Sequence, residues 1–203
     1  MAKTPMKPQL WTPRPVAETV TVYRDWAKDY DADVGARGYE TPARIAQALV
    51  PHLPLDTPIL DFGCGTGISG AALIRAGYRI IDGTDITDKM VEIAQTKDIY
   101  RKLWISEPGA VPAAPDQYGA IIATGVISLG AAPPETLDLL IAATAPNALI
   151  ALSFNDPTLA DGSFDAVVDA RLAAGQLALV SRSHGPHLTE MEMGSDVIVL
   201  RRS

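Results

Sequence analysis

Short apolar runs alternate with amphipathic segments along most of the chain. The runs are apolar over nearly their whole length, as strands buried on both faces of a parallel sheet are, and they cover residues 59–62, 79–84, 103–106, 118–124 and 148–154. Segments with apolar residues at helical spacing lie between them and predict helices that begin near residues 68, 88, 134 and 163. Two further runs, at 177–183 and 197–201, predict closing strands. This alternation is typical of an α/β protein with a doubly wound sheet and helices on both faces.

The residues before the first strand divide into two parts. Residues 1–15 contain four prolines and show no period, and we predict a flexible tail there. From residue 16 onward apolar residues recur at helical spacing, and a second helix is predicted at 43–53. A chain of 203 residues is long enough for one α/β domain and short for two. We therefore predict a single domain over residues 16–203 that begins with a helical segment, 16–57.

A glycine-rich turn follows the first strand. Gly63, Gly65 and Gly67 alternate directly after it, and glycine both adopts backbone angles closed to other residues and leaves room for a ligand against the backbone. Gly65, Gly67 and Gly70 also form G-x-G-x-x-G, the dinucleotide-binding fingerprint. The turn therefore predicts a nucleotide cofactor, but the glycines alone do not choose which one.

Two acidic residues narrow the choice of cofactor. Asp61 lies at the end of the first strand, where a carboxylate would repel a pyrophosphate and would favour a cationic ligand. Asp85 follows Gly65 by 20 positions at the end of the second run, where an acidic residue can accept hydrogen bonds from both ribose hydroxyls. The pair favours a cofactor that carries both a ribose and a positive charge.

The run Asp61-Phe62-Gly63-Cys64-Gly65-Thr66-Gly67 resembles motif I of the class I S-adenosylmethionine-dependent methyltransferases. The sulfonium and the ammonium of that cofactor are both positive. The pattern Tyr-x-x-Trp-Ala-x-x-Tyr-Asp, which starts at Tyr23, is similar to the small methyltransferases related to the Williams-Beuren syndrome region protein. The resemblance implies S-adenosyl-L-methionine as the cofactor and a Rossmann-like sheet of about seven strands, mostly parallel with an antiparallel strand near the C-terminus.

The resemblance also implies which residues bind the cofactor. Residues 16–57 form a helical lid over it, which brings Tyr23 and Tyr30 close. Asp85 holds the ribose, Ile86 lies against the purine, and Glu107 stands where the family generally has an aspartate that accepts from the adenine amino group. The cofactor-binding residues implied are Tyr23, Tyr30, Asp61, Gly63, Gly65, Thr66, Gly67, Asp85, Ile86, Met90, Glu107 and Thr124. Met90 is equally well explained as a core residue of the helix that Thr87 caps.

Charge and composition limit the acceptor. The formal net charge of −7 and the isoelectric point of about 4.9 provide no basic surface to neutralise phosphates, so we do not expect a nucleic-acid partner. No apolar run approaches the roughly 18 residues of a membrane span. There is one cysteine and no signal-peptide pattern, from which we expect a cytoplasmic protein. The acidic charge and the compact size favour a small-molecule acceptor.

Few side chains are candidates for catalysis. Cys64, inside the glycine turn, has a structural explanation, and the fourth strand runs into Thr124-Gly125-Val126 without the Pro-Pro-Tyr signature of base methylation. No carboxylate closes that strand, so we predict no metal site. The three histidines are expected to be solvated, two of them in a hairpin-like turn around Gly185-Pro186; they are His52, His184 and His187. Asp31 and Asp156 remain as carboxylate candidates, and no catalytic residue is assigned.

Three functions are consistent with these features. The first is methyl transfer from S-adenosylmethionine to a small molecule by in-line displacement, which positioning alone can accelerate. The second is a protein that binds this cofactor without methyl transfer, because the histidine that related proteins often carry after the fourth strand is absent. The third is a nicotinamide-dependent oxidoreductase, which the second glycine fingerprint supports, whereas Asp61 and the chain length oppose it. The pattern does not indicate the acceptor or the oligomeric state.

Overall fold

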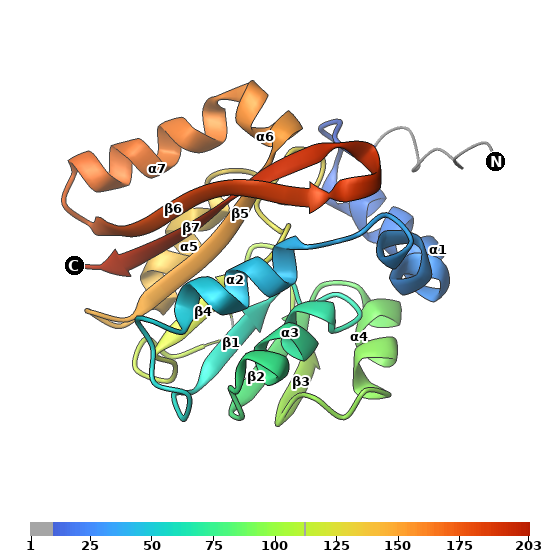
Figure 1. The fold of residues 1–203 in the computed structure, drawn as a ribbon, viewed down its shortest axis with the longest axis horizontal. Coiled ribbons are helices and arrows are strands. Elements are labelled where there is room, and N and C mark those ends of the chain that lie inside the picture. The colour runs from blue at the N-terminus through green and yellow to red at the C-terminus, as the bar shows by residue number, and fades with distance from the viewer. Residues whose placement is uncertain (1–9, 112) are drawn as a thin grey trace.

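One seven-stranded sheet runs through the protein, with helices on both faces (Figure 1). The structure is a computed structural model that describes residues 10–111 and 113–203. The strands are β1 (Ile59–Phe62), β2 (Ile81–Asp85), β3 (Lys102–Ile105), β4 (Ala120–Ala123), β5 (Leu149–Asn155), β6 (Leu177–Leu188) and β7 (Met193–Arg202). The helices are α1 (Val16–Gly35), α2 (Thr41–Leu49), α3 (Ile68–Ala76), α4 (Asp88–Gln95), α5 (Thr136–Ala143), α6 (Asp156–Asp161) and α7 (Ser163–Ala173), with a 3₁₀ turn, η1, at Thr189–Met191.

The strand order is β3-β2-β1-β4-β5-β7-β6. Strands β1 to β5 pair in parallel, and β7 pairs antiparallel with both β5 and β6. This confirms the predicted Rossmann-like sheet of seven strands, mostly parallel with antiparallel pairing at the C-terminal end. The order reverses between β1 and β4, and in sheets of this kind ligands bind at the carboxyl ends of the strands beside that reversal.

The two faces of the sheet are covered by different helices. On one face α5 and α7 pack against the apolar side chains of β1, β4 and β5. On the other face α2 and α3 contribute Ile45, Leu49 and Leu73, each fully buried. The second helix therefore packs on the sheet, and of the two helices in the segment predicted as a lid only α1 remains available for that role.

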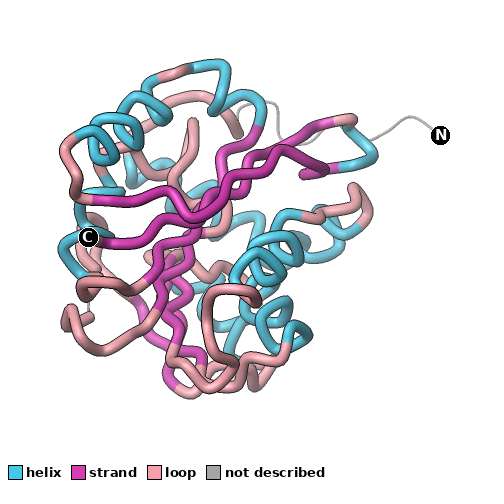
Figure 2. Tube along the Cα trace, turned by 60° about the vertical axis from the view of Figure 1, so that its left-hand side comes forward, coloured by secondary structure: helices cyan, strands magenta, loops and turns pink. Residues whose placement is uncertain are grey.

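The C-terminal hairpin is longer than the sequence predicted. Residues 184–187 were expected to form a turn, and that prediction is wrong because β6 continues through them to Leu188. Figure 2 shows the long pair of strands in magenta. A proline is tolerated there because β6 is the edge strand, and its register shifts between Pro186 and Leu188. The chain reverses instead at η1 and Glu192, whose φ is 55°.

The described part of the predicted tail is packed against the domain. Residues 1–9 lie outside the described residues, whereas Leu10 is only 7% exposed and packs with Trp26 and Val34 of α1. A Cβ on Gly130, after β4, would lie 1.9 Å from the Leu10 carbonyl oxygen, so the two backbones are in close contact. In residues 10–111 and 113–203 no helix has the length and apolar character to cross a membrane.

Candidate functional site

The glycine turn closes tightly after β1 and leaves one position open. The backbone N–H groups of Gly63 and Cys64 both donate to the carbonyl of Thr84, at 2.8 and 3.0 Å. Gly63, Gly65 and Gly67 all have positive φ, of 69°, 54° and 92°. A Cβ on Gly63 would meet Val126 at 2.3 Å, but one on Gly65 would meet nothing within 4 Å. Gly65 is therefore the glycine whose missing side chain leaves free space against the backbone.

Asp85 is bonded directly to this turn. It ends β2, and its Oδ2 accepts from the Gly65 N–H at 2.9 Å while its Oδ1 accepts from the Thr87 N–H at 2.8 Å. A carboxylate has about four acceptor positions, so further donors can still bind to it. Burial raises the pKa of Asp85. The structure thus brings together Gly65 and Asp85, both of which the sequence predicted to contact the cofactor.

Asp61 is fully buried at the end of β1. Its Oδ2 accepts from Ser69 Oγ at 2.6 Å and from the Tyr100 hydroxyl at 2.7 Å. Its Oδ1 has no hydrogen-bond partner in the part of the chain that the structure describes. Burial raises the pKa of Asp61 to about 6. A buried carboxylate with an unpaired oxygen is costly, and a donor or a cation at that oxygen would lower the cost.

Tyr100, which the sequence analysis did not single out, explains the second glycine fingerprint. Its ring lies against Gly67, Gly70 and Gly83: a Cβ on Gly70 would lie 2.5 Å from the tyrosine hydroxyl, and one on Gly83 would lie 2.8 Å from the ring. Gly70 therefore makes room for Tyr100, which in turn reaches Asp61. The G-x-G-x-x-G spacing has a packing explanation here and does not require a pyrophosphate.

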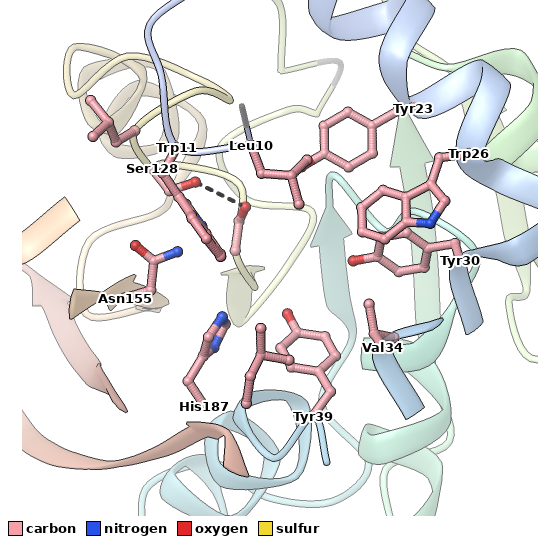
Figure 3. A pocket seen from close by; sticks show the side chains of 13 residues that line it. Leu10, Trp11, Tyr23, Trp26, Tyr30, Val34, Tyr39, Ser128, Asn155 and His187 are labelled. Carbon is pink, nitrogen blue, oxygen red and sulfur yellow. Dashed lines mark hydrogen bonds between the residues drawn. The ribbon is translucent and has the colours of Figure 1, made fainter. Parts of the chain in front are cut away.

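Helix α1 lies over the glycine turn and α4. Asp31 of α1 accepts hydrogen bonds from Thr66 Oγ1 in the turn and from Lys97 Nζ after α4, and Arg24 Nε is 2.9 Å from Asp88 Oδ1 at the start of α4. The tyrosines of this helix project toward the same region from beside Trp26, whose ring centroid is 4.7 Å from that of Tyr30 (Figure 3). Burial raises the pKa of both Tyr23 and Tyr30, so their phenols stay protonated.

We expect Asp31→Ala to weaken cofactor binding about fivefold. Asp31 fixes α1 to the turn through Thr66 and to the end of α4 through Lys97, and partly exposed charged contacts contribute about 1 kcal/mol. Asp29→Ala is the matched control, since Asp29 is exposed on the same helix. Titration calorimetry with S-adenosylhomocysteine measures both variants. If Asp31→Ala and Asp29→Ala bind with equal affinity, the contacts of Asp31 do not contribute to cofactor binding.

The remaining predicted cofactor residues lie at the ends of β2, β3 and β4. Ile86 is half-buried directly after β2, and Met90 of α4 is 2% exposed, as a core residue would be. Glu107 is exposed two residues after β3. The buried hydroxyl of Thr124, directly after β4, has no partner among the described residues. Their roles toward a cofactor stay predictions.

A cavity lies between α1 and the ends of β4, β5 and β6 (Figure 3). Its walls are mostly apolar or aromatic, with a few polar groups from the strand ends. The lining residues are Leu10, Trp11, Tyr23, Trp26, Tyr30, Val34, Tyr39, Gly125, Ser128, Leu129, Asn155, His187 and Leu188. Tyr23 and Tyr30 are thus the predicted cofactor neighbours that also face this cavity.

His187 was predicted to be solvated, and that prediction is wrong. It is 8% exposed and lines the cavity, with its ring in edge contact with Tyr39 at a centroid distance of 5.2 Å. Burial lowers the pKa of His187 to about 4, so the ring is neutral at neutral pH. Its burial was not predicted because the Gly185-Pro186 pair indicates a hairpin turn at this point. His184 is more exposed, but its Nδ1 is 2.9 Å from Asp196 Oδ1, and His52 is exposed as predicted.

The other candidates for catalysis are occupied or inert. Asp156 Oδ2 accepts from the Gly194 N–H at 2.7 Å, and Asp31 is held by Thr66 and Lys97. Burial raises the pKa of the Cys64 thiol well above its usual value, which disfavours a thiolate nucleophile. Within the described ranges no three acidic, histidine or cysteine side chains are grouped so as to hold a metal ion.

A family model described as a methyltransferase domain matches residues 34–192. The chain belongs to this methyltransferase family. This confirms the family predicted from the motif at residues 61–67. Human methyltransferase-like protein 27 is 31% identical to the chain over 143 residues, a match that covers 68% of this chain and 58% of the human protein. The match thus spans little more than half the length of that relative.

Solved structures show the same fold. Magnesium protoporphyrin IX methyltransferase from Synechocystis PCC 6803 with bound S-adenosylhomocysteine has a TM-score of 0.67 and 19% identity, over 91% of this chain and 100% of that chain. The same enzyme with bound S-adenosylmethionine has a TM-score of 0.65 and 19% identity, over 91% of this chain and 97% of that one. At this level of identity the likeness concerns the fold.

Proposed function

We propose that this protein transfers a methyl group from S-adenosylmethionine to a small-molecule acceptor. The observation that carries the proposal is the open backbone position at Gly65, bonded to the carboxylate of Asp85 at the reversal of the strand order. Membership of the methyltransferase family and the ligands of the structurally similar magnesium protoporphyrin IX methyltransferase support the same cofactor.

The residues present fit this cofactor. Asp85 has acceptor capacity left for the ribose hydroxyls, and Gly65 leaves room for the ligand against the backbone. Asp61 Oδ1 and the Thr124 hydroxyl, which have no partner among the described residues, lie at the ends of β1 and β4 and suit the charged and polar groups of the amino-acid part. Tyr30 and Tyr23 would cover the ligand from α1.

When bound, the cofactor supplies a methyl group activated by a positive sulfonium. The task of the chain is then to position the two reactants and to exclude water, which lowers the barrier of an in-line displacement without a covalent nucleophile. Helix α1 and the segment at Leu10 and Trp11 form the cover that excludes water, and the cavity beside them would hold the acceptor.

A nicotinamide cofactor is disfavoured by the same geometry. Gly70, the third glycine of the dinucleotide fingerprint, is in contact with the side chain of Tyr100. Asp61 places a buried carboxyl beside the turn. A pyrophosphate in that position would be repelled by an ionised Asp61. The packing of Tyr100 and the buried carboxyl of Asp61 therefore favour the sulfonium cofactor over a nicotinamide cofactor.

Parallel calorimetric titrations with S-adenosylhomocysteine and with NAD⁺ test the cofactor. We expect binding of the first and none of the second; the reverse result would overturn the proposal. Activity is tested separately by incubating the protein with S-adenosylmethionine and a panel of metabolites and measuring S-adenosylhomocysteine. Cofactor binding without turnover on any member of a broad panel would favour a protein that binds the cofactor without methyl transfer.

Affinity for S-adenosylmethionine should rise with pH. Asp61 has a pKa raised to about 6 in the free protein, so its carboxyl is mostly neutral below that pH and mostly ionised above it. A cation binds better beside the ionised form, and we expect affinity to increase up to about tenfold between about pH 5 and pH 7. Calorimetry across this range measures it, with Asp61→Asn as the control that flattens the profile. An equally steep profile in that variant would show that Asp61 does not cause the pH dependence of cofactor binding.

A further inference from the structure

A chain of hydrogen bonds, part-buried at Arg44 and buried beyond it, leads from Arg44 to the cavity. Arg44 Nη1 donates to Ser195 Oγ at 3.0 Å, Ser195 Oγ is 2.9 Å from Thr41 Oγ1, and Thr41 Oγ1 is 2.8 Å from Nδ1 of His187. Thr41 and Ser195 are fully buried. The first residue of α2 and a residue of β7 thus connect a permanent cation to the ring that lines the cavity.

The proton positions along this chain follow from counting donors and acceptors. A guanidinium can only donate, and Arg44 Nη1 shares its two protons among Ser195 Oγ and the carbonyls of Ser195 and Pro186, at 3.0, 2.9 and 3.0 Å. The Ser195 hydroxyl proton has one acceptor among the described residues, Thr41 Oγ1. Thr41 then donates its own proton to His187 Nδ1. With the proton on Nδ1 instead, one of the two buried hydroxyl protons would have no acceptor, which is disfavoured. The network therefore selects the tautomer of His187 that carries its proton on Nε2.

The amide of Asn155 is oriented in the same way. Its Oδ1 accepts from the Thr158 N–H at 3.1 Å and from Thr158 Oγ1 at 2.7 Å, and Thr158 Oγ1 itself accepts from the Leu129 N–H at 3.1 Å. Both acceptor positions of Oδ1 are thus used, and the amide nitrogen points into the cavity, as Figure 3 shows. The nitrogen-bearing edge of the His187 ring points into the same space. The polar end of the cavity therefore presents N–H donors from two strands.

We propose that His187 and Asn155 orient the acceptor by donating hydrogen bonds from Nε2 and Nδ2 to an oxygen atom of it, and that the acceptor is an apolar or aromatic small molecule with a carboxylate or carbonyl group. The proposal rests on the proposed function for the role of the cavity. Leu10, Trp11 and Leu129 provide the apolar walls for such a molecule. An ammonium group has no acceptor position and would meet donors at His187 and Asn155.

The tautomer can be measured without cofactor or substrate. Long-range ¹H–¹⁵N correlation spectra of the ¹⁵N-histidine-labelled protein at neutral pH should show His187 as the neutral Nε2–H form. Thr41→Val removes the hydroxyl at nearly constant shape and should release this preference, whereas Thr41→Ser keeps the hydroxyl and should retain it. An Nδ1–H ring or a charged ring for His187 in the unmodified protein would overturn the proposal.

Benzoate and benzylamine are matched probes for the ligand class. In the presence of S-adenosylhomocysteine, benzoate should shift the side-chain amide signals of Asn155 and the ring signals of His187, and benzylamine should not. His187→Ala should weaken benzoate binding by roughly fivefold to tenfold through the lost donor, and His184→Ala, on the same strand, should leave it unchanged. Absence of a benzoate response at these residues, or an equal response to benzylamine, would overturn the ligand class. Failure of S-adenosylhomocysteine to bind would instead overturn the proposed function, and the tautomer measurement would be unaffected.

Discussion

Gly65→Val should abolish binding of S-adenosylhomocysteine and leave a folded domain. The Cβ of the new side chain would project into the open space at the turn, where no described residue beyond the two chain neighbours lies within 4 Å and where we place the cofactor. The fold itself would bear only the backbone strain of a branched residue at a φ of 54°, about 1–2 kcal/mol or somewhat more. Calorimetry measures the binding, and circular dichroism with thermal melting measures the fold.

Gly175→Val is the matched control for this substitution. Gly175 also has a positive φ, of 67°, and a Cβ there would also meet nothing within 4 Å. It lies after α7, outside the candidate site, so the variant should carry a similar strain and bind the cofactor normally. Normal binding by both variants would place the cofactor site elsewhere in the protein.

Asp85→Ala should weaken S-adenosylhomocysteine binding by at least tenfold. Hydrogen bonds to a charged group contribute roughly 1.5–3 kcal/mol each, and roughly 1.4 kcal/mol corresponds to a factor of ten in affinity. The variant also removes the acceptor of the Gly65 and Thr87 N–H groups, so the turn loses part of its support. Calorimetric titration of the variant beside the unmodified protein measures the loss.

Asp85→Asn separates charge from shape. The amide keeps one oxygen, so one of the two backbone contacts of Asp85 can persist, but it offers fewer acceptor positions and no charge. Its affinity should lie between those of the unmodified protein and Asp85→Ala. Unchanged affinity in both variants would contradict a role of this carboxylate in binding.

The parts of the fold that were predicted correctly depend on residues close together in the sequence. The parallel strands are short apolar runs, and the turn at Gly63, Gly65 and Gly67 follows β1 directly, so local pattern is sufficient to place them. Gly65 and Asp85 were assigned to one cofactor site, but the direct contact between them was not predicted; it forms because the carboxyl ends of neighbouring parallel strands lie side by side in a sheet of this order.

The parts that were missed depend on contacts between distant residues. Tyr100 fills the slot beside Gly70 and Gly83 only once α3, β2 and the loop before β3 are assembled, and no local pattern marks it. His187 and Thr41 are 146 positions apart. A Gly-Pro pair is a strong local turn signal, but at this edge of the sheet the pairing of β6 with β7 overrides it.

The most direct test of the central claim is a double-mutant cycle between Asp85 and the ribose. The affinities of S-adenosylhomocysteine and of its 2′-deoxyribose analogue are measured by calorimetry for the unmodified protein and for Asp85→Ala. We predict that the analogue binds more weakly than the parent compound to the unmodified protein but about equally well to the variant, because the partner of the missing hydroxyl is already gone. If the two losses simply add, Asp85 does not contact the ribose, and both the cofactor and its orientation at the glycine turn are contradicted.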